Sequence, residues 1–278
     1  MKILISGCSF TGGSDVIHNA ETGLLEPNGQ QTWANLFETF MPEANINNIA
    51  LGGNSNDKIF RRAFDELCDP VGPGYDYAII QWTALHRQER YSCMIKDWVN
   101  FCNIGQVKTD DPYNKVVGTF DKGLYSWHVD DGKYMDPDHA SISIERSFDL
   151  TNRALTAELL HGKSVQDFRI DYLKNVLVMQ HALQSRNIPY LFTSMSNESH
   201  LPTIANGGSA FDYNPDNVMC DLERQLINGI DLDNWTRTPM SFMMDNNQLS
   251  HDDSHPNQLG HKLIYKHIHK HMHKDINQ

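Results

Sequence analysis

The feature that most constrains this fold is an alternation of short apolar runs with segments of helical periodicity. Runs typical of buried strands occupy residues 2–5, 44–51, 75–82 and 188–193. Apolar residues recur at helical spacing near residues 33–40, 59–67, 165–183, 218–227 and 263–272. Strands that alternate with helices form a parallel sheet with helices on both faces. The sequence therefore predicts an α/β domain with a central parallel sheet.

Two polar stretches interrupt this alternation. Residues 12–30 are rich in Gly, Asn and Glu and predict a long loop over the carboxyl edge of the sheet. Residues 84–153 lose their periodicity and predict an insertion that packs over the same edge, with a helical part near Met94–Phe101. We expect residues 1–278 to form one domain, because candidate site residues near both termini must meet in one fold.

Composition excludes several classes of function. The 278-residue chain has a formal net charge of −12, which disfavours binding to nucleic acid or to an anionic membrane surface. Its five cysteines are scattered and form no Cys-x-x-Cys pair, so neither a zinc site nor a disulfide framework is indicated. No leader peptide and no apolar run of membrane-spanning length is evident. We expect a soluble protein that is made and kept inside a cell.

A serine follows the first predicted strand in a Gly-x-Ser turn. Such a turn presents the hydroxyl of Ser9 at the carboxyl edge of the sheet, where α/β proteins place their ligands. A serine needs a base, and the base needs an orienting group. Asp252 and His255 stand three residues apart near the C-terminus, so the carboxylate can hold the imidazole while its other nitrogen faces Ser9. Asp253 is the rival orienting group.

Other interpretations compete for these residues. Ser9 can be an ordinary polar turn residue, and Asp252-x-x-His255-Pro can simply cap the next helix. Cys8 is a more reactive atom type, but its place in the middle of Gly-x-Ser favours a buried thiol. The same stretch resembles a phosphate-binding loop, although Gly13 stands where that loop has lysine and helical periodicity does not begin until about residue 32.

Five histidines and four lysines alternate along the last predicted helix. The histidines include two i,i+4 pairs, His267/His271 and His269/His273, which is a spacing found in metal sites. A solvated helix face with a cationic C-terminal end explains the pattern better, because lysines repel a metal ion and no third ligand converges in sequence. The sequence therefore predicts no metal site and no cofactor.

Three motifs together resemble the SGNH hydrolases, also called GDSL esterases and lipases. They are Gly-Cys-Ser-Phe at 7–10, Asn-Ile-Ala-Leu-Gly-Gly-Asn-Ser-Asn at 48–56 and Asp-x-x-His-Pro at 252–256. The resemblance spans almost the whole chain and implies a three-layer α/β/α sandwich of the flavodoxin type. It also implies a triad of Ser9, His255 and Asp252, with an oxyanion hole formed by the backbone N–H groups of Ser9 and Gly53.

The chain departs from the family in the third motif. Where the family has an oxyanion-binding asparagine after the third strand, this chain has Thr83, whose hydroxyl has a shorter reach. Asn54 or Arg87 could supply the missing donor, and loss of one such donor costs about 10²–10³ in rate. Arg87 could also hold an anionic group of the substrate, or it could pair with Glu89 or with acids of the insertion. Trp82 could form an aromatic floor for a sugar ring, or it could pack in the core.

The sequence thus predicts a serine ester hydrolase that removes a small acyl group, such as acetyl, from a carbohydrate or small ester. A second hypothesis is an SGNH-like module with little catalysis that binds a glycan or a protein partner, as in a phage particle. The third is acyl transfer, which differs from hydrolysis only in the acceptor. The oligomeric state is left open.

Overall fold

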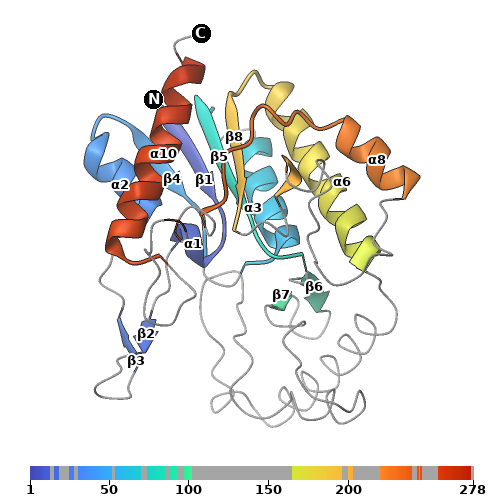
Figure 1. Ribbon diagram of the computed structural model, residues 1–278, viewed down its shortest axis with the longest axis horizontal. Coiled ribbons are helices and arrows are strands. Elements are labelled where there is room, and N and C mark those ends of the chain that lie inside the picture. Colours follow the sequence, from blue (N-terminus) through green and yellow to red (C-terminus); the bar gives the residue numbers. More distant parts are fainter. Residues whose placement is uncertain are drawn as a thin grey trace.

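The computed structural model describes about half of the chain. The described residues are 1–12, 16–18, 25–27, 31–51, 54–69, 74–85, 88–92, 97–101, 165–195, 200–202, 220–239, 243, 245 and 256–276. They form a sheet covered by helices on both faces (Figure 1).

Four parallel strands form the central sheet. They are β1 (Lys2–Ser6), β4 (Asn45–Asn48), β5 (Tyr77–Trp82) and β8 (Tyr190–Ser194), in the order β4-β1-β5-β8. Ile3 lies opposite both Ile46 and Tyr77, and Ile80 lies opposite Phe192. Counted along the chain these strands run 2-1-3-4, which is the flavodoxin-type order with the first strand inside the sheet. All four predicted strands and their parallel arrangement are confirmed.

A short segment extends the sheet beyond β8. Trp235 forms a parallel bridge with Phe192. The Phe192 N–H donates to the Asn234 carbonyl at 2.8 Å, and the Thr236 N–H donates to the Phe192 carbonyl at 2.9 Å. The sequence did not reveal this strand-like segment, because it is too short to show a strand pattern.

Helices cover both faces of the sheet and give a three-layer sandwich (Figure 1). On one face α3 (Asn56–Cys68) packs on α6 (Val165–Gln184), and α8 (Asp221–Asn228) packs on α6. On the other face lie α2 (Trp33–Phe40) and α10 (Gln258–Ile276), which contact each other. This arrangement confirms the predicted α/β/α architecture.

The helix boundaries follow from local capping. The Thr32 hydroxyl accepts from the Asn35 N–H at 3.2 Å and caps α2, and the Ser55 hydroxyl accepts from the Lys58 N–H at 3.2 Å and caps α3. Of the two predicted caps for α3, Asn54 and Ser55, the structure uses Ser55.

An ion pair joins α6 to α8 inside the protein. The Arg169 Nε donates to the Glu223 Oε1 at 2.5 Å, and the Glu223 side chain is fully buried. The second carboxylate oxygen accepts from the Gln166 Nε2 at 3.0 Å and from the Cys220 N–H at 2.7 Å. The carboxylate therefore fixes the first turn of α8 against α6.

Two local predictions are wrong. Residues 12–30 are not loop throughout, because β2 (Val16–His18) pairs antiparallel with β3 (Leu25–Pro27). The helix predicted near Met94–Phe101 is replaced over its last five residues by β7 (Asp97–Phe101), which pairs with β6 (Gln88–Ser92). In that ladder Tyr91 lies opposite Trp98, and aromatic and β-branched residues favour strands.

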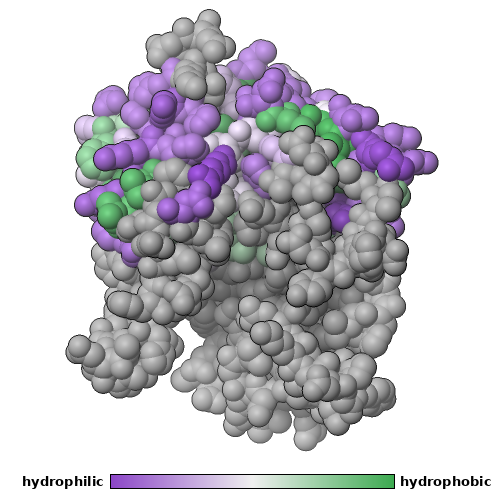
Figure 2. Space-filling model, viewed as in Figure 1, coloured by the Kyte–Doolittle hydropathy of each residue, from purple (hydrophilic) through white to green (hydrophobic). Residues whose placement is uncertain are grey.

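The described outer surface is mostly hydrophilic on the face shown in Figure 2. Large hydrophobic side chains that are exposed among the described residues are Met1, Phe40, Val178, Leu222 and Leu259. Among these residues no helix is long and apolar enough to cross a membrane.

Candidate active site

Ser9 lies where the first strand gives way to a helix. β1 ends at Ser6, and α1 (Ser9–Gly12) begins three residues later at the carboxyl edge of the sheet (Figure 1). The N–H groups of Thr11 and Gly12 both donate to the Cys8 carbonyl at 2.9 Å. Helical structure therefore starts at Ser9 and not near residue 32. A single turn is too short for periodicity to reveal. Ser9 is only 8% exposed.

Two glycines let this loop pack tightly. A Cβ at Gly7 would overlap the Thr11 hydroxyl and lie 3.1 Å from the Gln81 Cβ. A Cβ at Gly12 would lie 2.6 Å from the Ala50 carbonyl oxygen, which is backbone and cannot easily move. The Ser9 loop therefore has little room to shift relative to β5 and to the end of β4.

Gln81, on β5, contacts the Ser9 loop through its side chain. Its Oε1 accepts from the Thr11 hydroxyl, and the Cys8 Sγ lies 3.7 Å from the same oxygen. Cys8 is fully buried, which confirms the prediction of a buried thiol. The role of Gln81 could not be predicted, because its position in an apolar strand indicates only burial.

Asn54 joins the second motif to the Ser9 loop. Its Nδ2 donates to the Gly7 carbonyl at 2.9 Å, and the Leu51 N–H donates to the same oxygen at 3.3 Å. The Asn54 side chain is fully buried. Its amide nitrogen, considered above as a donor to substrate, is therefore directed to the protein backbone. Gly53 lies outside the described residues.

Thr83 is held by Asn56, a residue that sequence reasoning missed. The Asn56 Oδ1 accepts from the Thr83 N–H at 2.8 Å, and its Nδ2 donates to the Thr83 carbonyl at 3.1 Å. Thr83 is fully buried, and its hydroxyl is directed to the Met195 sulfur at 3.8 Å. The only sequence signal for Asn56 is its place in the polar Asn-Ser-Asn run after the two glycines.

The remaining predicted residues fall into two groups. Trp82 is fully buried and makes edge contacts with Tyr172 and Phe192, so core packing accounts for it. Arg87, Asp252, Asp253 and His255 lie outside the described residues.

The chain that follows His255 is anchored at the start of α2. The Gln31 N–H donates to the Gln258 Oε1 at 3.1 Å, and the Trp33 N–H donates to the His261 Nδ1 at 3.2 Å. Because α2 also contacts α1, the first turn of α10 and the Ser9 loop belong to one region at the carboxyl edge. The topology therefore brings segments from the two ends of the chain toward each other.

The histidines of α10 do not form the solvated face that the sequence predicted. His261 is buried, and its Nδ1 accepts the Trp33 N–H. His269 is half-buried against Phe37 and Tyr265. His273 is exposed, and its Nε2 lies 2.9 Å from that of His269.

His267 is also drawn into the fold. Its Nε2 lies 2.6 Å from the Thr236 hydroxyl, next to the strand-like segment beside β8. Burial, followed by the nearby charges of His271, Arg237 and Lys270, lowers the pKa of His267 to about 4. Within the described part of the chain, no three His, Cys, Asp or Glu residues converge as a metal site.

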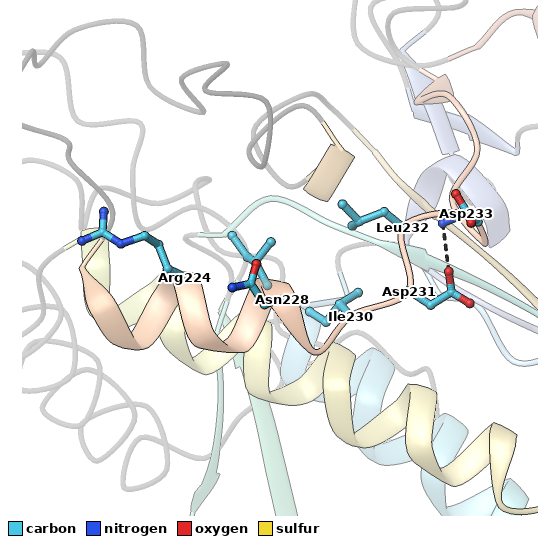
Figure 3. Close-up of a pocket in the computed structure, with 7 residues that line it drawn as sticks. Arg224, Asn228, Ile230, Asp231, Leu232 and Asp233 are labelled. Carbon is cyan, nitrogen blue, oxygen red and sulfur yellow. Dashed lines mark hydrogen bonds between the residues drawn. The ribbon is translucent and has the colours of Figure 1, made fainter.

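A surface pocket lies at the opposite edge of the sheet. It is lined by the second half of α8 and by residues 230–233, which lead to the segment beside β8, and its volume is about 590 Å³ (Figure 3). The Asp231 carboxylate accepts there from the Asp233 N–H at 3.0 Å and from the Asn234 Nδ2 at 2.9 Å. These bonds form the turn that leads into the sheet, so the carboxylate serves the fold. None of the predicted site residues lines this pocket.

Solved structures that resemble this chain share little sequence identity with it. The chain matches no family model and no curated protein. A psychrotrophic esterase, EstA from Pseudoalteromonas sp., is 11% identical over 100% of this chain and 99% of that chain, with a TM-score of 0.44. An acetyl xylan esterase, AlAXEase, is 12% identical over 97% and 98%, with a TM-score of 0.42. LAE5, an α/β hydrolase enzyme from the metagenome of Lake Arreo, is 13% identical over 96% and 92%, with a TM-score of 0.36.

Proposed function

We propose that this protein is a serine ester hydrolase. The observation that carries the proposal is the hydrogen bonding of the second-motif residues Leu51 and Asn54 to the Gly7 carbonyl, two residues before Ser9. This contact joins the loop of the candidate nucleophile to the residues that flank Gly53. Both segments lie at the carboxyl edge of a parallel sheet, where α/β proteins bind ligands.

In the proposed reaction the Ser9 hydroxyl attacks the ester carbonyl while His255 takes its proton. Asp252 orients the imidazole and stabilises its charged form. The backbone N–H groups of Ser9 and Gly53 donate to the oxyanion that forms. His255 then returns the proton to the leaving alcohol, and water releases the acyl group from Ser9 by the same steps in reverse.

The proposed substrate carries a small acyl group, such as acetyl, on a carbohydrate or another small alcohol. An uncharged ester suits a chain with a formal net charge of −12, which repels anionic substrates. Acyl transfer to an alcohol other than water uses the same residues and differs only in the acceptor.

A second candidate is a binding module with little catalysis, and one observation favours it. The Thr83 hydroxyl is buried against Met195, and the fully buried Asn54 directs its amide nitrogen to Gly7. Neither side chain then offers the third oxyanion donor that the SGNH pattern includes. A glycan or protein partner would replace the ester in this case.

Labelling with a fluorophosphonate, followed by peptide mass mapping, tests the hydrolase. We expect the label on Ser9 and hydrolysis of an acetyl ester that is abolished by Ser9→Ala and by His255→Ala. Ser185→Ala, which alters a hydroxyl bonded to the Ala182 carbonyl on α6, is the matched control and should keep full activity. An unlabelled Ser9, together with wild-type turnover in Ser9→Ala, would leave the binding module as the better proposal.

A further inference from the structure

Gln81 connects the central sheet to the turn that carries Ser9. It lies on β5, next to the last residue of the strand, and it is fully buried. Its Oε1 accepts from the Thr11 hydroxyl, and the Cys8 Sγ lies 3.7 Å from the same oxygen. Cys8 immediately precedes Ser9, and Thr11 follows it two residues later. One amide oxygen therefore contacts the chain on both sides of the proposed nucleophile.

The turn depends on such contacts for its position. α1 is a single helical turn, in which the Thr11 N–H donates to the Cys8 carbonyl at 2.9 Å. An isolated turn of this length is not stable in water, so the rest of the fold must hold it. The fit is close, because a Cβ at Gly7 would overlap the Thr11 hydroxyl and lie 3.1 Å from the Gln81 Cβ. A change in the Gln81 side chain is therefore passed to Thr11 and to the turn.

The stability of the fold alone does not explain a glutamine at this position. The Gln81 Nε2 is buried and has no hydrogen-bond partner among the described residues. A buried donor without a partner lowers the free energy of unfolding, and an apolar side chain would not bring such a donor into the core. The preceding residues on β5, Ile79 and Ile80, are apolar and fully buried. Groups that break this local rule are expected at functional sites, where another advantage offsets the cost.

We propose that Gln81 is a positioning residue for the nucleophile, because its bond to Thr11 holds the α1 turn where the Ser9 hydroxyl and N–H meet the ester. This inference rests on the proposed hydrolase. A shift of about 1 Å in a reacting group can cost about 10²-fold in rate. Gln81 acts through Thr11 and does not touch the substrate, so loss of the bond should lower kcat and leave KM nearly unchanged.

Two single variants and their combination test this role. Gln81→Met and Thr11→Val each remove the bond between the two side chains and keep their approximate size. We expect each variant to lower kcat for an acetyl ester, and the rate of fluorophosphonate labelling at Ser9, by about 10-fold to 100-fold. In the double variant both partners are apolar, a change that can be nearly neutral for stability. Its urea midpoint should therefore be close to that of wild type, while its kcat falls no further than that of the slower single variant.

Two further variants separate positioning from stability. Thr11→Ser keeps the hydroxyl and should keep kcat close to that of wild type. The matched control is Thr193→Val, because Thr193 lies opposite Gln81 on β8, is fully buried, and donates its hydroxyl to the Arg237 carbonyl at 3.2 Å. This control should lower the urea midpoint and leave kcat and the labelling rate unchanged. If Gln81→Met does not fold, Thr11→Val removes the same bond from the other side.

The two proposals fail in different ways. Wild-type kcat and labelling rate in Gln81→Met and Thr11→Val would overturn the positioning role alone. Losses of kcat that multiply in the double variant, or an equal loss in Thr193→Val, would also overturn that role and leave the hydrolase standing. A wild type that is neither labelled at Ser9 nor active would overturn the hydrolase, and the positioning role with it.

Discussion

The buried Arg169–Glu223 pair predicts a large effect of a small change. In Glu223→Gln the Arg169 guanidinium keeps its buried place and loses its counter-charge. The new side chain offers one acceptor oxygen where the carboxylate offered two to Arg169, Gln166 and the Cys220 N–H. Breaking one side of a buried ion pair costs about 3–5 kcal/mol. We expect the free energy of unfolding to fall by about that amount at pH 7.

Urea denaturation followed by tryptophan fluorescence measures this loss, provided that the m value stays constant. The matched control is Asp221→Asn, which makes the same acid-to-amide change in the same helical turn. Asp221 pairs with Arg224 on the surface, so its loss should cost about 1 kcal/mol or less. A loss in Glu223→Gln no larger than that of the control would refute the reasoning. Arg169→Met combined with Glu223→Met should recover much of the stability.

The same ion pair should make the free energy of unfolding depend on pH in the acid range. Burial alone would raise the pKa of Glu223, but hydrogen bonds from Gln166, the Cys220 N–H and Arg169, with the Arg169 charge, outweigh it and lower the pKa. The pair therefore stabilises the fold above the pKa that Glu223 has in the unfolded chain. This stability is lost as pH falls through the lowered folded value. The unfolding free energy of the wild type should fall more steeply in acid than that of Glu223→Gln.

Three other predictions concern the sheet edge and α10. Gly12→Ala places a Cβ 2.6 Å from the Ala50 carbonyl and should lower the unfolding free energy by about 1–3 kcal/mol, measured by urea denaturation. The pKa of His267 in the folded protein is about 4, below its ordinary value of about 6.5, so the thermal midpoint should fall as the pH is lowered from about 6.5 to 4. His267→Gln should flatten that dependence. Thr83→Val should keep kcat within about tenfold of wild type, because the hydroxyl is directed to Met195, whereas a loss of about 10²–10³ would assign it to the oxyanion hole.

The two inner strands of the sheet could be predicted because their apolar composition indicates burial. Residues 3–5 and 77–82 are buried along their whole length, as continuous apolar runs in a parallel sheet should be. Helix α3 could be placed because Ser55 caps it and Ile59, Ala63 and Leu67 form one buried stripe. Local sequence patterns of this kind predict an element without any knowledge of its tertiary contacts.

Features that depend on distant partners could not be predicted in the same way. His261 and His269 look like surface residues in an alternating His/Lys tail, yet their environment is set by α2, more than 220 residues away in sequence. The strand β7 shows few turn signals before it, and only its pairing with β6 distinguishes it from a helix. Trp82 reads equally well as a ligand platform and as a core residue until Tyr172 is placed against it.

The site follows the same division. Ser9 could be proposed from the strand and the turn alone, but the amides that organise its surroundings could not, because each acts on a residue far away in sequence. Asn54 bonds Gly7, Asn56 bonds both backbone groups of Thr83, and Gln81 accepts from Thr11. These three side chains bond to the protein's own backbone and to the Ser9 loop. In the SGNH pattern, by contrast, one asparagine side chain is directed to the substrate. If the protein is a hydrolase, its oxyanion hole then relies on backbone N–H groups. A missing third donor costs about 10²–10³ in rate. We therefore expect slow turnover. The rate should also depend more strongly on rigid placement of the two remaining N–H donors than it does in an enzyme with three donors.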